Sequence, residues 1–414
     1  MKMIQALCGI VLLAAVMLLQ AGRAVSQTND EIFIYGKITT TDNKTYIGPI
    51  RWGEEEVYWT DIFNSSKTEN DYVDFLSRQD RKKLDEKSGK VEIFGLKVAS
   101  WTNSGSHSHT FACQFGDIQS IEMRGRDRVN LQVRNGEVFR LDGGSNDIGA
   151  TVNILDSDMG LVELDWDMID NVQFQSTPGA LPKKFGEPLF GTVTTHDREF
   201  TGLVQWDQDE RLGEDELDGE TMDGDVSILF KQIAAIEKRG NSCRVKLHSG
   251  KELLVSGSND VDRGNRGVIV TMPGVAVVTI DWRDFRSVRF ESATAIINQA
   301  YGDFGSPRKL EGTIVTTDGT KYSGALVYDL DEAWDLEMLQ GDEDDMEYII
   351  PFRSIKKITP RNFRSSLVEL RNGHQLKLQA TQDVNEDNDG LLIFNASEKP
   401  IWIAWEKVDY VEFE

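Results

Sequence analysis

Positive charge is scarce in this sequence. Its 414 residues include 45 Lys and Arg against 69 Asp and Glu, so the formal net charge at pH 7 is −24. An acidic surface repels phosphate backbones, whereas nucleic-acid binding depends on neutralising phosphates with Lys and Arg. We therefore expect no nucleic-acid partner.

Cysteine and catalytic motifs are scarce too. The three cysteines are Cys8, Cys113 and Cys243, and the last two fall at non-corresponding positions of the repeat described below, so we expect no disulfide between them. The sequence lacks a Gly-x-Ser-x-Gly elbow, a glycine-rich phosphate loop, a His-Glu-x-x-His motif and a paired-cysteine zinc signature. These absences favour a protein that is not an enzyme.

Only one long apolar run is present, at the N-terminus. Lys2 precedes a nearly continuous apolar stretch over residues 4–19, and Ala24, Val25 and Ser26 offer small residues for cleavage. We predict a signal peptide over residues 1–26 and export to the periplasm or the extracellular space, with no membrane span after its removal. The alternative is an uncleaved segment that anchors the protein in a membrane.

The sequence does contain one residue pattern that occurs three times. The matching residues are Gly36, Ile38, Thr40, Asp42, Tyr46, Gly48, Ile50 and Trp52; Gly191, Val193, Thr195, Asp197, Phe200, Gly202, Val204 and Trp206; and Gly312, Ile314, Thr316, Asp318, Tyr322, Gly324, Leu326 and Tyr328. Such self-similarity is typical of tandem repeats. We place the repeats at 27–176, 189–292 and 310–414, with Pro- and Gly-bearing linkers at 177–188 and 293–309.

Apolar and polar residues alternate with period two inside each copy, which predicts strands with one buried face. Asp- and Asn-containing turns separate the first two runs and predict a hairpin. The spacing predicts two sets of five short strands per copy, each with a one-turn helix before the last strand. This arrangement resembles small SH3-like or Sm-like barrels, a likeness of architecture that implies no function. We therefore predict an all-β protein of about six barrel modules, divided within the copies near residues 124, 239 and 360.

The first copy carries an insertion at about residues 64–109. Residues 70–87 are charged with apolar residues at helical spacing, which predicts a surface helix. Residues 91–101 alternate toward a turn, which predicts a hairpin. The insertion could recognise a partner or cap the end of the array.

Acidic residues follow the aromatic end of the first hairpin in every copy. They form solvated loops or, with two carboxylates converging, the acid and base of a hydrolase. A calcium loop is a further possibility over Asp383, Asn385, Asp387 and Asp389, where oxygen donors alternate and end at a glycine. The corresponding loop of the second copy has Gly264 and Arg266 in place of Asp387 and Asp389, which favours turn geometry over metal ligation.

Basic residues recur at the junction between the two modules of each copy. The recurring arginines are Arg124, Arg126, Arg239, Arg244, Arg361 and Arg364. They could orient neighbouring modules through ion pairs, or they could hold an anionic ligand in a groove between modules. His107 and His109 would share a face if their segment is a strand, and they are a weaker pair of contact candidates.

Repetition of one module suits a binding surface better than a catalytic site. We therefore predict an exported, non-enzymatic binding or scaffolding protein that uses no cofactor and whose partner is another protein or an envelope polymer. The alternatives are a cell-envelope glycan hydrolase that uses carboxylates of the acidic loops, and a Ca²⁺-stabilised structural protein.

Overall fold

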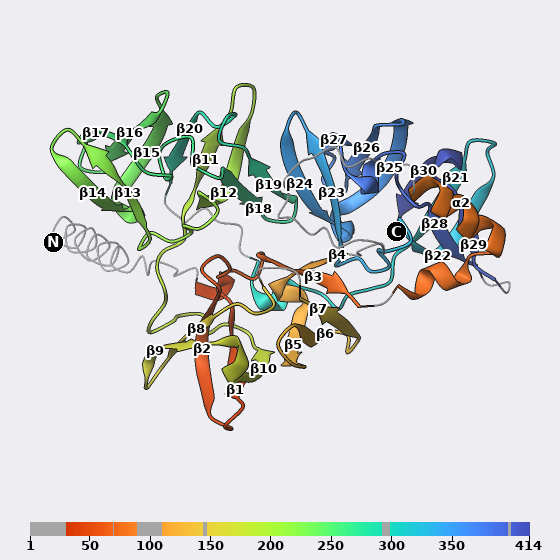
Figure 1. Ribbon diagram of the computed structural model, residues 1–414, viewed down its shortest axis with the longest axis horizontal. Helices are drawn as coiled ribbons and strands as arrows, with labels where there is room; N and C mark the ends of the chain where they lie inside the picture. Colours follow the sequence, from red (N-terminus) through yellow and green to blue (C-terminus); the bar gives the residue numbers. More distant parts are fainter. Residues whose placement is uncertain (1–29, 69, 89–109, 144–146, 292–298, 396–398) are drawn as a thin grey trace, which may run out of the picture.

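The structure is a computed structural model that describes residues 30–68, 70–88, 110–143, 147–291, 299–395 and 399–414. Its strands form a ten-stranded and a twenty-stranded antiparallel sheet (Figure 1), which confirms the all-β prediction. Among these residues no helix is long and apolar enough to cross a membrane. The predicted signal peptide lies outside the described residues.

The first unit spans residues 30–174. Its strands are β1 (Tyr35–Thr40), β2 (Thr45–Trp52), β3 (Ile62–Lys67), β4 (Thr110–Gln114), β5 (Ile118–Met123), β6 (Arg128–Val133), β7 (Val138–Asp142), β8 (Val152–Asp156), β9 (Gly160–Leu164) and β10 (Ile169–Phe174). Its short 3-10 helices are η1 (Asp30–Ile32), η2 (Asp71–Phe75), η3 (Phe115–Asp117) and η4 (Trp166–Met168), and its α-helix is α2 (Arg78–Ser88).

The second unit spans residues 190–290 and has ten strands as well. They are β11 (Phe190–Thr194), β12 (Glu199–Trp206), β13 (Glu216–Thr221), β14 (Gly224–Leu229), β15 (Ile233–Lys238), β16 (Ser242–Leu247), β17 (Glu252–Ser256), β18 (Val268–Met272), β19 (Ala276–Ile280) and β20 (Ser287–Phe290), with the 3-10 helix η5 (Phe230–Gln232) before β15.

The third unit spans residues 311–413. Its strands are β21 (Glu311–Thr316), β22 (Lys321–Val327), β23 (Met338–Glu343), β24 (Met346–Pro351), β25 (Ile355–Asn362), β26 (Ser365–Leu370), β27 (Gln375–Gln379), β28 (Leu391–Phe394), β29 (Ile401–Ile403) and β30 (Val408–Phe413). Its 3-10 helices are η8 (Phe352–Ser354), η9 (Gln382–Val384) and η10 (Trp405–Lys407), and η7 (Tyr301–Asp303) lies in the segment before it.

Hydrogen bonding joins the strands of each unit in the same order. In the first unit the order is β4-β3-β7-β6-β5-β10-β1-β2-β8-β9. The second unit follows it as β14-β13-β17-β16-β15-β20-β11-β12-β18-β19. The third unit follows it as β24-β23-β27-β26-β25-β30-β21-β22-β28-β29.

This pairing differs from the two consecutive barrels that we expected in each copy. The hairpin β1–β2 pairs with β8 and β10 of the second half, whereas β6–β7 pairs with β3 and β5 of the first half. The two halves thus exchange their leading hairpins. Among the described strands, no ladder joins β4 to β5 or β9 to β10, so neither half is a closed barrel. Local alternation could not reveal the exchange, because a hairpin offers the same apolar face to either half.

The two glycines of the repeated pattern face each other in the antiparallel hairpin of the first two strands of a unit. Gly191 pairs with Gly202. A Cβ on Gly191 would lie 2.4 Å from the carbonyl oxygen of Arg289, and one on Gly202 would lie 2.2 Å from that of Thr271. Only glycine permits so close an approach of neighbouring backbones.

An aromatic side chain fills the core of each unit at the end of its second strand. Trp52, Trp206 and Tyr328 are fully buried, so they are core residues and not exposed ligand platforms. Their donor atoms bond to main-chain carbonyl oxygens: Trp52 Nε1 to Asp147 at 2.9 Å, Trp206 Nε1 to Asp260 at 2.9 Å and Tyr328 OH to Asp383 at 2.6 Å.

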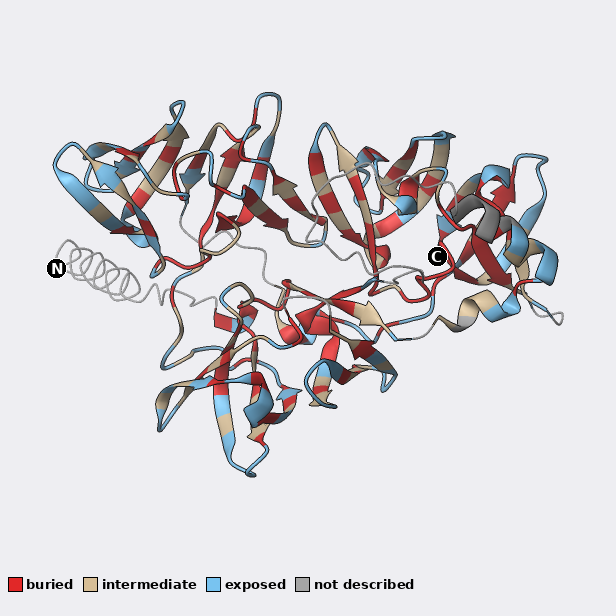
Figure 2. Cartoon of the chain, viewed as in Figure 1, coloured by how far each residue is buried: buried red, intermediate tan, exposed pale blue. Residues whose placement is uncertain are grey.

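The units are joined by strand pairing and by buried ion pairs. β19 pairs with β24 and so joins the second and third units into the twenty-stranded sheet. Arg211 Nη2 of the second unit lies 2.8 Å from Asp61 Oδ1 of the first unit, and Arg353 of the third unit is ion-paired with Asp117 of the first. Buried residues continue from the strand faces into these junctions (Figure 2).

The insertion of the first unit lies against the third unit (Figure 1). η2 and α2 occupy the region in which we predicted a helix over 70–87. The ring of Phe75 packs edge-on against Phe394, with ring centroids 5.4 Å apart, and Asn70 Nδ2 donates to the carbonyl oxygen of Leu330 at 2.9 Å. The predicted hairpin lies outside the described residues.

Candidate functional site

A pocket of about 230 Å³ lies where the first unit meets the third. β4 forms one wall, and the turn after β22, the start of β23 and the η9 loop form the others. Five of the lining residues are acidic: Asp329, Asp331, Glu332, Glu337 and Asp383. Pockets between structural units are common ligand sites, and we take this one as the candidate site and call it the acidic pocket.

A tight turn after β22 brings three of these carboxylates together. Asp329 and Leu330 have positive φ angles of 50° and 55°, which reverse the chain. The N–H of Tyr328 donates to the carbonyl oxygen of Glu332 at 2.8 Å, and the N–H of Glu332 donates back to Tyr328 at 3.0 Å. The turn therefore holds Asp329, Asp331 and Glu332 together in the lining of the pocket.

A lysine from the first unit neutralises two of the five acids. Lys67 Nζ lies 2.8 Å from Asp331 Oδ1 and 2.5 Å from Glu337 Oε1. Its side chain is only 12 % exposed, and these carboxylates raise its pKa despite burial. Glu337 Oε2 also accepts the N–H groups of Ala333 and Trp334 at 2.7 and 2.9 Å. Lys67, Asp331 and Glu337 therefore form a structural link between units.

Lys67 also lowers the pKa of Glu332, but less than burial raises it. The side chain of Glu332 is buried, with 8 % of the residue exposed, and its Oε2 has no hydrogen-bond partner among the residues that the structure describes. Burial, followed by repulsion from Asp331 and Asp383, raises the pKa of Glu332 well above its usual range. Burial raises the pKa of Asp329 in the same way. Burial therefore favours the protonated, neutral form of Glu332 over the carboxylate.

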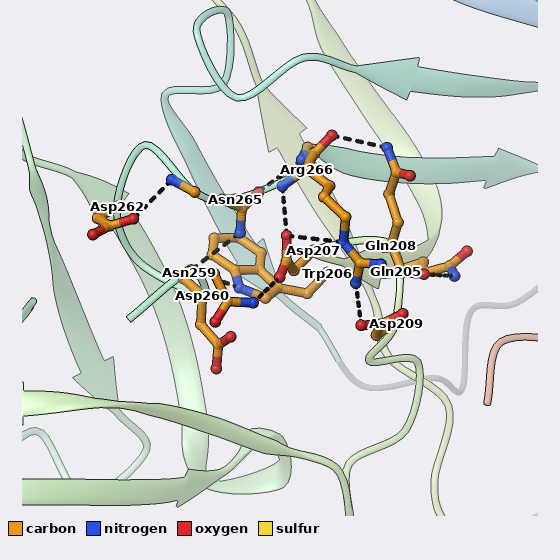
Figure 3. A network of polar contacts seen from close by, with 12 residues as sticks. Gln205, Trp206, Asp207, Gln208, Asp209, Asn259, Asp260, Asp262, Asn265 and Arg266 are labelled. Atoms are coloured by element: carbon orange, nitrogen blue, oxygen red, sulfur yellow. Dashed lines mark hydrogen bonds and ion pairs between the residues drawn. The ribbon is translucent and has the colours of Figure 1, made fainter. Parts of the chain in front are cut away.

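The second unit has the same turn with a different charge balance (Figure 3). Asp207 and Gln208 adopt the positive φ angles there, 48° and 62°. Arg266 lies against the turn: it is ion-paired with Asp209, and its Nε lies 3.6 Å from Asp207 Oδ1. The N–H of Arg266 also donates to Asp207 Oδ1. The second unit thus supplies its own cation.

Two residues of the predicted calcium loop, Asn385 and Asp383, accept main-chain hydrogen bonds with their side-chain oxygens. Asn385 Oδ1 accepts the N–H of Asp387 at 2.7 Å, and Asp383 Oδ2 accepts the N–H of Gln340 at 2.6 Å. The N–H of Asp389 donates to Asp329 Oδ1. Within the described ranges, no group of three or more His, Cys, Asp or Glu side chains is arranged to hold a metal ion. The geometry is that of a hydrogen-bonded turn that also covers the acidic pocket.

Of the recurring arginines, Arg124, Arg126, Arg239 and Arg364 lie in the turns after β5, β15 and β25, whereas Arg244 lies on β16 and Arg361 on β25. Arg124 Nη2 lies 2.7 Å from Glu122 Oε2, and Arg239 and Arg244 lie 2.7 and 3.6 Å from Glu237. Arg126 and Arg361 are exposed, and the guanidinium of Arg364 lies over the ring of Phe363. The structure thus places these residues at or beside hairpin turns, where Arg124, Arg239 and Arg244 pair within their own hairpins.

Two further sets of candidates can be placed. His107 and His109 lie outside the described residues. Cys113 and Cys243 are buried, unpaired thiols, and burial raises the pKa of Cys243 to about 12.

A second pocket, of about 250 Å³, is basic and lies near the C-terminus. Its arginines are already engaged: Arg353 with Asp117, Arg308 Nε with Asp335 Oδ2 at 3.4 Å, and Arg371 Nη2 with the Glu414 carbonyl oxygen at 2.6 Å.

Sequence reasoning missed Lys67 and Glu337, which lie outside the repeated pattern. The sequence comparison of the second and third copies did identify the difference between Arg266 and Asp389. It used that difference as evidence against a calcium site and did not identify a change of charge beside the turn. No protein-family model, no curated protein and no solved structure matches this chain.

Proposed function

We propose that this protein is an exported, non-enzymatic scaffold whose three units are tandem repeats of one module and which binds a partner protein by strand addition. One observation carries the proposal. In the second unit, β19 pairs with β24 of the third unit, with Val277 opposite Ile349 and Val278 opposite Tyr348. In the first unit, none of the described strands pairs with the outer edge of β9, the strand that corresponds to β19.

The side chains on β9 fit this role. Leu161 takes the place that Val277 has in the second unit, and it is 61 % exposed, beside Met159 at 71 %. Ile47, on the neighbouring end of β2, is 44 % exposed. An unpaired edge with apolar side chains is a template for another strand, and the joined units supply a fixed base for it.

The experiment compares partner capture by the wild type with that by Leu161→Lys and Leu254→Lys. Leu254 has the same 61 % exposure but lies on β17, which has partner strands on both sides. We expect a protein from a cell-envelope extract to be enriched by the wild type and Leu254→Lys and to be lost with Leu161→Lys. Equal enrichment by all three chains would contradict the proposal.

A second candidate function is hydrolysis of an envelope glycan. It is favoured by the convergence of carboxylates from two chain segments, Glu332 and Asp383, on one pocket, since glycosidases use such a pair. If it is correct, purified protein should cleave an envelope oligosaccharide and Glu332→Gln should abolish the cleavage.

A further inference from the structure

The joint between the second and third units combines strand pairing with charge complementarity. β24 runs antiparallel to β19, and arginines of the second unit contact acids around the β23–β24 turn. Arg198 lies 2.5 Å from Glu343 and 2.6 Å from Asp344. Arg283 Nη2 lies 3.5 Å from Asp345 Oδ2. The second unit thus presents basic side chains to an acidic hairpin.

The first unit presents acids at the corresponding edge. Glu163 of β9 takes the place of Thr279 of β19, because the two strands pair with β8 and β18 at the same register. Asp167 takes the place of Arg283, one residue after the tryptophan of the repeated Asp-Trp pair. Both acids are exposed. Residues 141–182 contain Asp and Glu but no Lys or Arg, so this edge is acidic.

Two lysines lie near β9, but each contacts another group. Lys44 takes the place of Arg198 in the turn of the first hairpin, and its Nζ lies 2.9 Å from Asp42 Oδ2. Lys183 lies by the β8–β9 turn, where its Nζ is 3.4 Å from the carbonyl oxygen of Ser157. The other end of β9, which carries Glu163, therefore stays acidic.

We infer that β9 binds an antiparallel strand of another protein that carries Lys or Arg opposite Glu163 and in the turn facing Asp167. The inference rests on the proposed strand addition and specifies the chemistry of the partner. Opposite charges on directly facing residues stabilise a strand pair, whereas like charges destabilise it. β9 lies at the outside of the first unit, away from the other two units, where such a strand can reach it (Figure 1).

The same register argues against a second copy of this chain as the occupant. The candidate strand from a second copy is β14, which corresponds to β24. Asp225 of β14 takes the place of Glu347, because both strands pair with the preceding strand at the same register. Asp225 would therefore face Glu163, and Asp223 of the adjoining turn would face Asp167. Like charges would meet at both places.

The experiment measures binding of two synthetic peptides to the full chain by calorimetry. One peptide has the sequence of residues 338–351, and the other has the same sequence with Asp345→Lys and Glu347→Lys. We expect the basic peptide to bind at least about fivefold more tightly at low ionic strength, and the difference to shrink as salt is added. Equal binding, tighter binding of the acidic peptide, or no binding of either overturns the inference.

Charge reversal tests the location of the site. Glu163→Lys combined with Asp167→Arg should reverse the preference, so that the acidic peptide binds more tightly. Glu252→Lys is the matched control, because Glu252 is exposed but lies on β17, which has partner strands on both sides. A double variant that still prefers the basic peptide would overturn the assignment to β9. Melting curves establish that each variant folds, and Glu163→Gln, which should reduce the preference, replaces a double variant that does not.

Partner capture from a cell-envelope extract separates this inference from the proposed function. Capture that survives Leu161→Lys contradicts strand addition itself. Capture that Leu161→Lys abolishes, but that the charge-reversed double variant retains in full, refutes only the charge of the partner strand. Self-association of the wild type that Leu161→Lys removes, measured by sedimentation, would identify a second copy as the occupant and overturn the inference.

Discussion

The ion pair between Arg211 and Asp61 gives the sharpest test of how the first two units are joined. Both residues are buried, at 4 % and 3 % exposure, and their charged atoms lie 2.8 Å apart. Removing one partner of a buried pair leaves an uncompensated charge, which costs about 3–5 kcal/mol. We therefore expect Arg211→Met to lower the free energy of unfolding by that amount.

Replacing both partners should cost much less. Burial raises the pKa of Asp61 even though Arg211 lowers it, so the desolvation penalty exceeds the attraction between the two charges. Asp61→Asn keeps an oxygen for the N–H groups of Val57 and Tyr58, which lie 2.7 and 2.8 Å from Asp61 Oδ2. The double variant Arg211→Met with Asp61→Asn should therefore be within about 1–2 kcal/mol of the wild type.

The assay is urea unfolding of the wild type, both single variants and the double variant, followed by tryptophan fluorescence. A coupling free energy of about 3 kcal/mol between the two positions is expected. Lys356→Met is the control, because the side chain of Lys356 is 48 % exposed and that of its partner Glu369 is 26 % exposed, and it should leave the midpoint unchanged. If Arg211→Met is as stable as Lys356→Met, or if the double variant is as unstable as the sum of the singles, the reasoning is wrong.

Three further outcomes are expected. Burial raises the pKa of Asp147 to about 7. The contribution of the protonated Asp147 to stability is therefore present below pH 4 and is lost as the pH rises through 7. In urea unfolding, Asp147→Asn should be more stable than the wild type by about 2–4 kcal/mol at pH 8.5 and equal to it at pH 4. Gly116→Ala should lower stability by about 1–3 kcal/mol, because its Cβ would lie 2.3 Å from the ring of Phe304, and Phe304→Ala in the same chain should relieve part of the loss. Cys243 should react with a thiol reagent at least about 100-fold more slowly in the native protein than in urea, because only the thiolate reacts.

The sequence predicted local structure well because alternation and turn chemistry act locally. The hairpins that end at Trp52, Trp206 and Tyr328 form as predicted, since their apolar residues recur every second position and Asp or Asn occupies the turns. One-turn helices precede β5 and β10 as predicted, because their apolar residues also recur at a fixed local spacing. It did not predict which hairpin pairs with which half, because β1–β2 and β6–β7 present the same apolar face, and only the complete sheet decides between them.

The acidic pocket needed information that no single copy contains. Its five carboxylates come from the third unit, but β4 comes from the first unit, as does Lys67, which lies 264 residues before Asp331 in the chain. Alternation and spacing cannot relate residues at that distance. What the sequence did contain was the exchange of Arg266 for Asp389 between two loops that share Asp260 with Asp383 and Gly267 with Gly390.

That exchange leaves the turn unchanged and alters which residue supplies its cation. The turn, its positive φ angles and its bond to the following loop are common to the second and third units, so they serve the fold. In the second unit the guanidinium of Arg266 pairs with Asp209. In the third unit the corresponding Asp331 pairs with Lys67 of the first unit. The turn of the third unit therefore depends on a cation from another unit, and removing Lys67 takes one partner from a buried ion pair, which is costly to folding.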